Sequence, residues 1–235
     1  MNKVGDLERT VPTALMIVLL GEFNGNSKAM PYLRRHGWGR MWSSYGPDWE
    51  YDNEPWGFDN GAWSAYKSGK PWSAKRFLRR MEMALRLSED HAPIVAALPD
   101  VVGNAVNTLN LVDKWIDRLP EWSWFLVLQD GMTEHSVLPF ITDQRIHGLF
   151  LGGTDEFKST AARWCRFAHR FDKRFHFGRC SREQWIRNAI EIGADSMDST
   201  RPVKQIGYGE PSGVRWFRMF ETLVTGQCPQ KTLSL

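Results

Sequence analysis

The chain has little cysteine, no long hydrophobic run and no strong excess of charge of one sign. Its three cysteines, Cys165, Cys180 and Cys228, are odd in number and widely spaced, so they form neither a metal-ligand pattern nor a disulfide framework. A reducing cytoplasm is therefore the expected location. The net charge of +3 is too small to indicate a nucleic-acid partner by itself. With 42% hydrophobic and 24% charged residues, the composition is that of a globular protein rather than a disordered one.

The longest apolar run near the start, ALMIVLL at residues 14–20, is too short to cross a bilayer. It also lacks a signal-peptide cleavage site, because Gly21, Glu22 and Phe23 follow it. We interpret it as the first buried strand and expect no membrane partner.

Apolar segments alternate with amphipathic ones through the rest of the chain, which is typical of a parallel sheet with covered faces. We expect one domain over residues 1–235 with the α/β fold of a compact (β/α)8 TIM-like barrel, and we keep an open doubly wound sheet as the alternative. Further strands are predicted within residues 55–63, 92–100, 122–131, 146–154, 173–181 and 194–200. Helices are predicted over residues 73–90, 104–118, 133–143, 155–171, 181–192 and 212–225.

Tryptophan is unusually frequent, and six of the twelve tryptophans lie at positions 38, 42, 49, 56, 63 and 72. We expect a Trp-rich insertion near 37–72 that forms a large loop packed by its own aromatic rings. The alternative is that some of these rings stack on the bases of a nucleic acid.

Polar groups and glycines follow the predicted strands, and in a barrel they would all face the rim that carries the active site. Some of the acidic residues could instead be helix N-caps. Converging carboxylates at one rim indicate acid/base or covalent chemistry. The strand-end residues are Asp59, Asp100, Gln129, Asp130, Gly152, Gly153, Arg179 and Asp198.

These strand ends resemble the tRNA-guanine transglycosylase superfamily, in the same order along the chain, over roughly residues 56–202. FDNGAW (58–63) is similar to the family's Asp-Ser-Gly-Gly-Phe-Gln segment, and IVAALPD (94–100) resembles the strand with the base-reading aspartate. VLQDG (127–131) and LFLGGT (149–154) resemble its Gln-Gly and Gly-Gly strand ends. Residues 176–200, ending in GADSMDST, resemble its closing Gly-x-Asp-x-x-Asp stretch.

The chain also departs from that family. No zinc module of the Cys-x-Cys-x-x-Cys…His type is present, and we expect no RNA-binding appendage after Pro202. Ala62 replaces the second glycine of the family's Asp-Ser-Gly-Gly motif, and the family's final glutamine is either replaced by Ser64 or missing. A compact, zinc-free form is most similar to the phage and genomic-island branch that places 7-deazaguanines in DNA.

The resemblance implies a role for each strand end. Asp198 would be the covalent nucleophile and Asp59 the proton donor and acceptor, with an N-cap and an Asx turn as their structural alternatives. Asp100 would accept hydrogen bonds from N1–H and the 2-amino group of a purine. The other substrate-binding groups would be Gln129, Asp130, Gly152, Gly153 and Arg179. Asp195 would support the site without chemistry.

Two basic clusters could contact phosphates or could simply be solvated helix faces. One is the stretch from Arg163 to Arg182, and the other comprises Arg34, Arg35 and Arg40. His176 is expected to be a satisfied buried histidine rather than a catalyst.

The expected activity is exchange of guanine in DNA for a free 7-deazaguanine base, such as the 7-cyano form, with no cofactor and no metal. The DNA would present a flipped or single-stranded nucleotide, in the host cytoplasm if the gene belongs to a phage. The alternatives are a tRNA-directed transglycosylase, a non-catalytic nucleic-acid-binding barrel and a nucleoside hydrolase.

Overall fold

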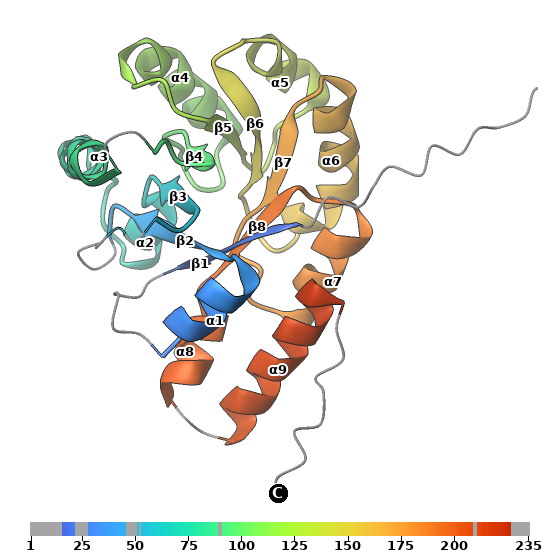
Figure 1. The fold of residues 1–235 in the computed structure, drawn as a ribbon. Coiled ribbons are helices and arrows are strands. Elements are labelled where there is room, and N and C mark those ends of the chain that lie inside the picture. Colours follow the sequence, from blue (N-terminus) through green and yellow to red (C-terminus); the bar gives the residue numbers. More distant parts are fainter. Residues whose placement is uncertain are drawn as a thin grey trace, which may run out of the picture.

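The computed structural model describes residues 16–21, 28–45, 51, 53–88, 91–208 and 211–226, and its strands close into an eight-stranded barrel (Figure 1). Every strand pairs in parallel with the next one along the chain, and β8 returns to pair with β1. The predicted (β/α)8 barrel is therefore confirmed, and the open sheet is excluded. The strands are β1 (Ile17–Gly21), β2 (Gly39–Ser43), β3 (Trp56–Asp59), β4 (Val95–Ala97), β5 (Trp124–Leu128), β6 (Ile146–Leu151), β7 (Arg174–Phe177) and β8 (Ser196–Ser199).

Helices surround the strands, and α9 lies beside α7 and α8 (Figure 1). Helix α8 was not expected from the sequence, whereas α9 matches the helix predicted at 212–225. None of the helices in the described part of the chain is long and apolar enough to cross a membrane. The helical elements are α1 (Met30–His36), α2 (Ala62–Lys67), α3 (Ala74–Ser88), α4 (Ala105–Trp115), η1 (Ile116–Arg118), α5 (Glu134–Ile141), η2 (Phe157–Thr160), α6 (Ala161–Arg170), α7 (Glu183–Glu191), α8 (Arg201–Tyr208) and α9 (Pro211–Thr225).

The Trp-rich region is part of the barrel, so the expected insertion near 37–72 is wrong. It contains β2, β3 and α2, and β2 is the strand that the sequence prediction missed. Trp38, Trp42 and Trp56 are buried in the apolar layer between the strands and the helices. β2 was missed because its sequence, GRMWS, places glycine and arginine where a buried strand usually has apolar residues. Trp49 lies outside the described residues.

Alternate residues along each strand point into the barrel or toward the helices. On β8, Met197 belongs to the outer apolar layer, whereas Ser196 and Asp198 take the opposite face. The second apolar cluster comes from alternate strand positions and fills the barrel interior. It consists of Leu19, Met41, Val95, Ala97, Phe125, Val127 and Phe150.

The barrel interior is closely packed where β5, β6 and β7 meet. A Cβ on Gly148 would lie 2.3 Å from Cε1 of Phe125 and 2.5 Å from the carbonyl oxygen of Arg174. The backbone oxygen cannot move away without breaking the β6–β7 pairing. This position therefore tolerates no side chain.

We predict that Gly148→Ala lowers the free energy of unfolding by about 2 kcal/mol, because overpacking a core typically costs ~1–3 kcal/mol. Urea denaturation followed by circular dichroism measures the change. Val106→Ala, at a residue that is 67% exposed, is the control and should stay within about 0.5 kcal/mol of the parent. Equal stability of the two variants would contradict the packing described here.

Candidate active site

A pocket opens at the carboxyl ends of the strands, at the rim where (β/α)8 barrels carry their active sites. The sequence predicted eight site residues, and seven of them line this pocket. The exception is Asp130. The lining residues are Asp59, Asn60, Trp63, Ala97, Asp100, Val102, Val127, Gln129, Phe150, Gly152, Gly153, Arg179 and Asp198.

Asp198, at the end of β8, is held through only one of its carboxylate oxygens. Oδ1 accepts a hydrogen bond from the backbone N–H of Arg179 at 2.9 Å and contacts Nε2 of His176 at 3.1 Å. Among the described residues, no group donates to Oδ2. The residue is 7% exposed and lines the pocket. Asp198 therefore offers one oriented, unengaged oxygen to whatever enters.

His176 supports Asp198 from β7. Its ring is fully buried, and Nδ1 lies 2.8 Å from Oγ of Ser196. Because the carboxylate can only accept, Nε2 carries the proton, and Nδ1 then accepts from the Ser196 hydroxyl. The expectation of a satisfied buried histidine is confirmed, and its partner is the predicted nucleophile. The sequence did not reveal that contact because it depends on the β7–β8 pairing.

Asp195 lies at the beginning of β8, away from Asp198. Its Oδ2 accepts hydrogen bonds from the backbone N–H of Phe175 at 2.7 Å and from Nε2 of His169 at 2.9 Å. It does not line the pocket. Asp195 therefore stabilises the start of β7 and does not line the pocket.

Asp100 is buried between two side-chain amides. Its Oδ1 accepts from Nδ2 of Asn60 at 2.7 Å, and its Oδ2 accepts from Nε2 of Gln129 at 2.6 Å. Burial raises the pKa of Asp100 to about 7, and the negative charge of Asp59 adds to this, while the two amides and Arg179 oppose it. Both oxygens are fixed, and each keeps a lone pair for another donor. Asp100 is therefore an oriented acceptor whose charge changes near neutral pH.

Gln129 and Asp130 take different roles, which the sequence could not separate. Oε1 of Gln129 accepts from the backbone N–H of Gly103 at 2.8 Å, so both ends of its amide are fixed. Asp130 instead accepts from the backbone N–H of Thr154 at 2.9 Å and from its hydroxyl at 2.6 Å. Its prediction as a substrate-binding residue is not supported, because its side chain is used to hold the loop after β6.

The Gly152–Gly153 pair allows close packing beside this amide. A Cβ on Gly152 would lie 2.8 Å from Nε2 of Gln129, and Gly153 adopts a left-handed φ of +67°. A side chain at either position would disturb the pocket wall. Their backbone consequently lines the pocket directly.

Asp59, at the end of β3, serves the turn that follows and also lines the pocket. Its Oδ1 accepts from the backbone N–H of Gly61 at 2.7 Å, which is the Asx turn considered as its structural alternative. This turn also directs Asn60 toward Asp100. The two interpretations of Asp59 are therefore compatible.

Arg179 closes the pocket from the β7 side. Its guanidinium carbon lies 3.7 Å from the centre of the Trp63 ring, and Nη2 donates to the carbonyl oxygen of Gly153. The free volume of the pocket is about 40 Å³, and the Arg179 guanidinium lies over Trp63 at its wall. Trp63, one of the tryptophans for which stacking on bases was the alternative, lines the pocket and is a ring on which a planar ligand could stack.

Lys158 supports the turn that carries Arg179. It is 1% exposed, and its ammonium group donates to the carbonyl oxygens of Gly178 and Arg179. Burial, followed by the nearby Arg179 charge, lowers the pKa of Lys158 to about 8. Arg179 itself has a left-handed φ of +56°, which turns its N–H toward Asp198. Lys158 therefore fixes a strained turn on which the Asp198 geometry depends.

Comparison of the sequence with protein-family models and with curated proteins gives no match. The function is therefore inferred from the pocket. Within the described residues, no group of three or more histidine, cysteine or acidic side chains could hold a metal ion. The pocket brings together Asp198, a carboxylate with one unengaged oxygen, and Asp100, an oriented hydrogen-bond acceptor.

Several arginines of the two basic clusters are paired with carboxylates. Arg40 is buried and paired with Glu54, and Arg163 and Arg170 both pair with Glu134.

We predict that the carboxyl carbon of Asp100 titrates with a midpoint near pH 7 in a ¹³C NMR experiment. Gln129→Leu should move the midpoint upward, because the lost amide donor stabilises the carboxylate form. Arg118→Gln, on η1 before β5 and so at the opposite end of the barrel, is the control and should leave the midpoint unchanged. A midpoint near 4 in the parent protein would contradict the burial of this group.

Proposed function

We propose that this protein exchanges guanine in DNA for a 7-deazaguanine base through a covalent aspartyl-sugar intermediate. One observation carries the proposal. Asp198, with one oxygen held and the other unengaged, lines the same pocket as Asp100, whose two oxygens are fixed as acceptors. An attacking carboxylate next to a carboxylate that accepts N–H hydrogen bonds suits a base that must be recognised and then displaced.

In the first step, Oδ2 of Asp198 attacks C1′ of the nucleotide. The C1′–O bond forms as the bond from C1′ to N9 breaks, and the electron pair of that bond passes to guanine. Asp59 supplies a proton to the departing base. His176 and the Arg179 N–H keep Oδ1 engaged, so the attacking oxygen is held in one orientation.

In the second step, the 7-deazaguanine base occupies the place that guanine left. Asp59 accepts its N9 proton, and N9 attacks C1′. The C1′–O bond to Asp198 then breaks and regenerates the carboxylate. Two displacements at the same carbon retain the sugar configuration, and no oxidant, reductant or metal is needed.

Asp100 accounts for base selectivity in this proposal. Guanine and 7-deazaguanine both present N1–H and a 2-amino group, whereas adenine has an acceptor at N1. With adenine, the buried Asp100 carboxylate would face the N1 lone pair without a hydrogen bond, which is strongly unfavourable. The Gly152–Gly153 backbone would border the 6-oxo side of the ring.

Entry of the base requires Arg179 to leave Trp63. The guanidinium and a purine are both flat, and both can stack on an indole ring. Arg179 has a long side chain with several rotatable bonds, and after leaving Trp63 its guanidinium can bind a phosphate or sugar oxygen of the nucleotide.

We expect the purified protein to incorporate labelled 7-cyano-7-deazaguanine into guanine-containing DNA. Asp198→Ala should reduce incorporation by about 10³-fold or more, because the covalent step is lost. It should also abolish a denaturation-resistant complex between protein and DNA. Asp113→Ala, an exposed aspartate on α4, is the matched control and should keep the parent rate.

The same assay separates the alternatives. Label that enters tRNA and not DNA would redirect the proposal to a tRNA transglycosylase. Release of free guanine without incorporation would indicate a hydrolase. Label that enters neither polymer, with no guanine released, would overturn the assignment of an enzyme and leave a non-catalytic barrel.

We also predict a pH dependence of kcat/KM. Asp100 must be a carboxylate to accept from N1–H, and its pKa is raised to about 7. Below that value the group becomes protonated, so kcat/KM should fall about tenfold for each further pH unit and level off above it. A value of kcat/KM that does not fall as the pH is lowered through 7 would contradict the role given to Asp100.

A further inference from the structure

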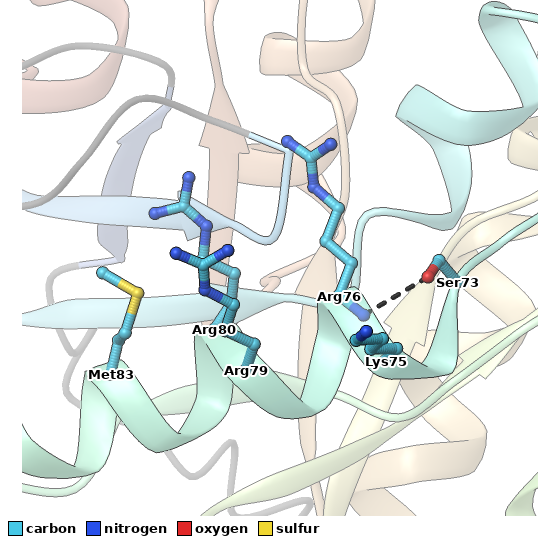
Figure 2. Close-up of a pocket in the computed structure, with 6 residues that line it drawn as sticks. All are labelled: Ser73, Lys75, Arg76, Arg79, Arg80 and Met83. Carbon is cyan, nitrogen blue, oxygen red and sulfur yellow. Dashed lines mark hydrogen bonds between the residues drawn. The ribbon is translucent and has the colours of Figure 1, made fainter.

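A basic groove lies along one flank of α3, separate from the pocket at the strand ends. It has a free volume of about 430 Å³. Figure 2 shows the side chains of Arg76, Arg79 and Arg80 extending from the same side of the helix. We call this feature the α3 groove. Its lining residues are Ser73, Lys75, Arg76, Arg79, Arg80 and Met83.

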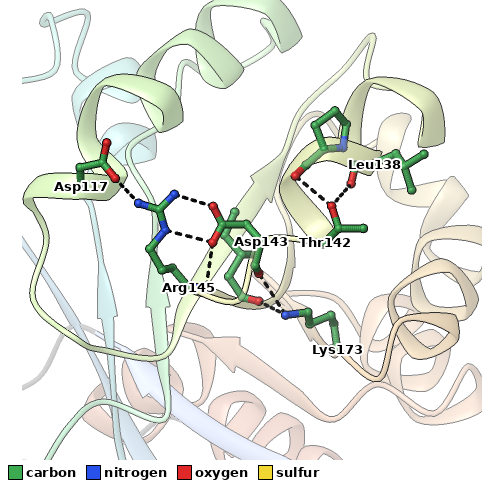
Figure 3. Close-up of polar contacts among 8 residues, drawn as sticks. Asp117, Leu138, Thr142, Asp143, Arg145 and Lys173 are labelled. Atoms are coloured by element: carbon green, nitrogen blue, oxygen red, sulfur yellow. Dashed lines mark hydrogen bonds and ion pairs between the residues drawn. The ribbon is translucent and has the colours of Figure 1, made fainter.

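Several arginines elsewhere on the described surface are paired with carboxylates. Figure 3 shows Arg145 between Asp117 and Asp143. The other exposed pairs are Arg163–Glu134, Arg170–Glu134, Arg182–Asp155 and Arg187–Glu183.

Lys75 and Arg79 have no ion-pair partner among the described residues. Glu82 is the single carboxylate within α3, and it lies beyond ion-pair distance of both. Like charges three and four positions apart destabilise a helix by ~0.2–0.5 kcal/mol each. Lys75 and Arg79 are thus like charges four positions apart on one flank of α3, without a carboxylate partner among the described residues. An anionic ligand would remove this repulsion.

A series of hydrogen bonds links Arg76, in the α3 groove, to the active-site pocket. Nε of Arg76 donates to the carbonyl oxygen of Ser44 at 2.8 Å, and its guanidinium lies 4.1 Å from the Tyr45 ring centre. The Ser44 hydroxyl donates to the carbonyl oxygen of Asn60 at 2.7 Å. Asn60 in turn donates to Asp100 inside the pocket. Arg76 is therefore connected to Asp100 through two intervening residues, Ser44 and Asn60.

We propose that the α3 groove binds the phosphodiester backbone of a nucleic-acid strand next to the nucleotide that enters the pocket. The identity of that nucleotide rests on the proposed function, whereas binding of the backbone does not. Lys75 and Arg79 supply the charges that phosphates need. Arg76, fixed by Ser44 and Tyr45, presents its guanidinium at the pocket end. The groove thus gives the strand a direction relative to Asp198.

The test is fluorescence anisotropy with a labelled single-stranded DNA and an RNA of the same sequence, over a range of salt concentrations. Lys75→Glu/Arg79→Glu is compared with Lys114→Glu/Arg118→Glu. The second pair is exposed on α4 and η1, leading into the amino end of β5, and changes the net charge equally. Circular dichroism and the Tm verify folding. If the reversal variant unfolds, Lys75→Ala/Arg79→Ala replaces it.

The groove variant should bind at least about tenfold more weakly, and the slope of log K against log salt should fall by about 1.4, since each lost phosphate contact contributes ~0.7 for single strands. The control should bind like the parent. Equal binding by the groove variant and the parent, or equal loss in the control, would overturn the proposal. Whichever of the DNA and the RNA binds more tightly is identified as the nucleic acid whose backbone the α3 groove binds. If binding falls as described but no base exchange occurs, the groove stands and the proposed function fails.

Discussion

The pocket depends on the burial of Asp100 between two amides from the neighbouring strands. Asn60 follows β3, Asp100 follows β4 and Gln129 follows β5, so the hydrogen bonds join three consecutive strand ends. A buried carboxylate without partners would cost several kcal/mol or become neutral. The amides offset part of this cost, and the remainder is visible as a pKa of about 7. Burial thus raises the pKa of Asp100, and the two amides that share the buried site fix the orientation of its carboxylate.

A second set of contacts orients Asp198, the proposed nucleophile. Ser196, His176 and Asp198 form a polar chain on the β7–β8 side of an otherwise apolar barrel interior. The left-handed turn at Arg179 adds a backbone donor to Asp198. The ammonium group of Lys158 holds that turn by donating to the carbonyl oxygens of Gly178 and Arg179. Strained backbone and a buried lysine are unfavourable for stability taken alone. Their common effect is to fix one oxygen of Asp198 and leave the other for chemistry.

The barrel and most of the pocket could be predicted from the sequence because both follow local rules. Apolar strands that alternate with amphipathic helices specify the fold, and strand-end positions specify the rim. β2 was missed because GRMWS carries no apolar alternation and is buried by tertiary contacts. Partners across strands had no local signal, which is why the roles of Asn60 and Lys158 emerged only from the structure. Gln129 and Asp130 could be separated only when the strand direction of each side chain was known.

A crystal structure of the protein with guanine tests the central claim most directly. The account predicts guanine in the pocket, with N1–H and the 2-amino group on Asp100, N9 toward Oδ2 of Asp198, and Arg179 displaced from the Trp63 ring. Guanine bound elsewhere, or bound with N9 turned away from Asp198, would contradict the account.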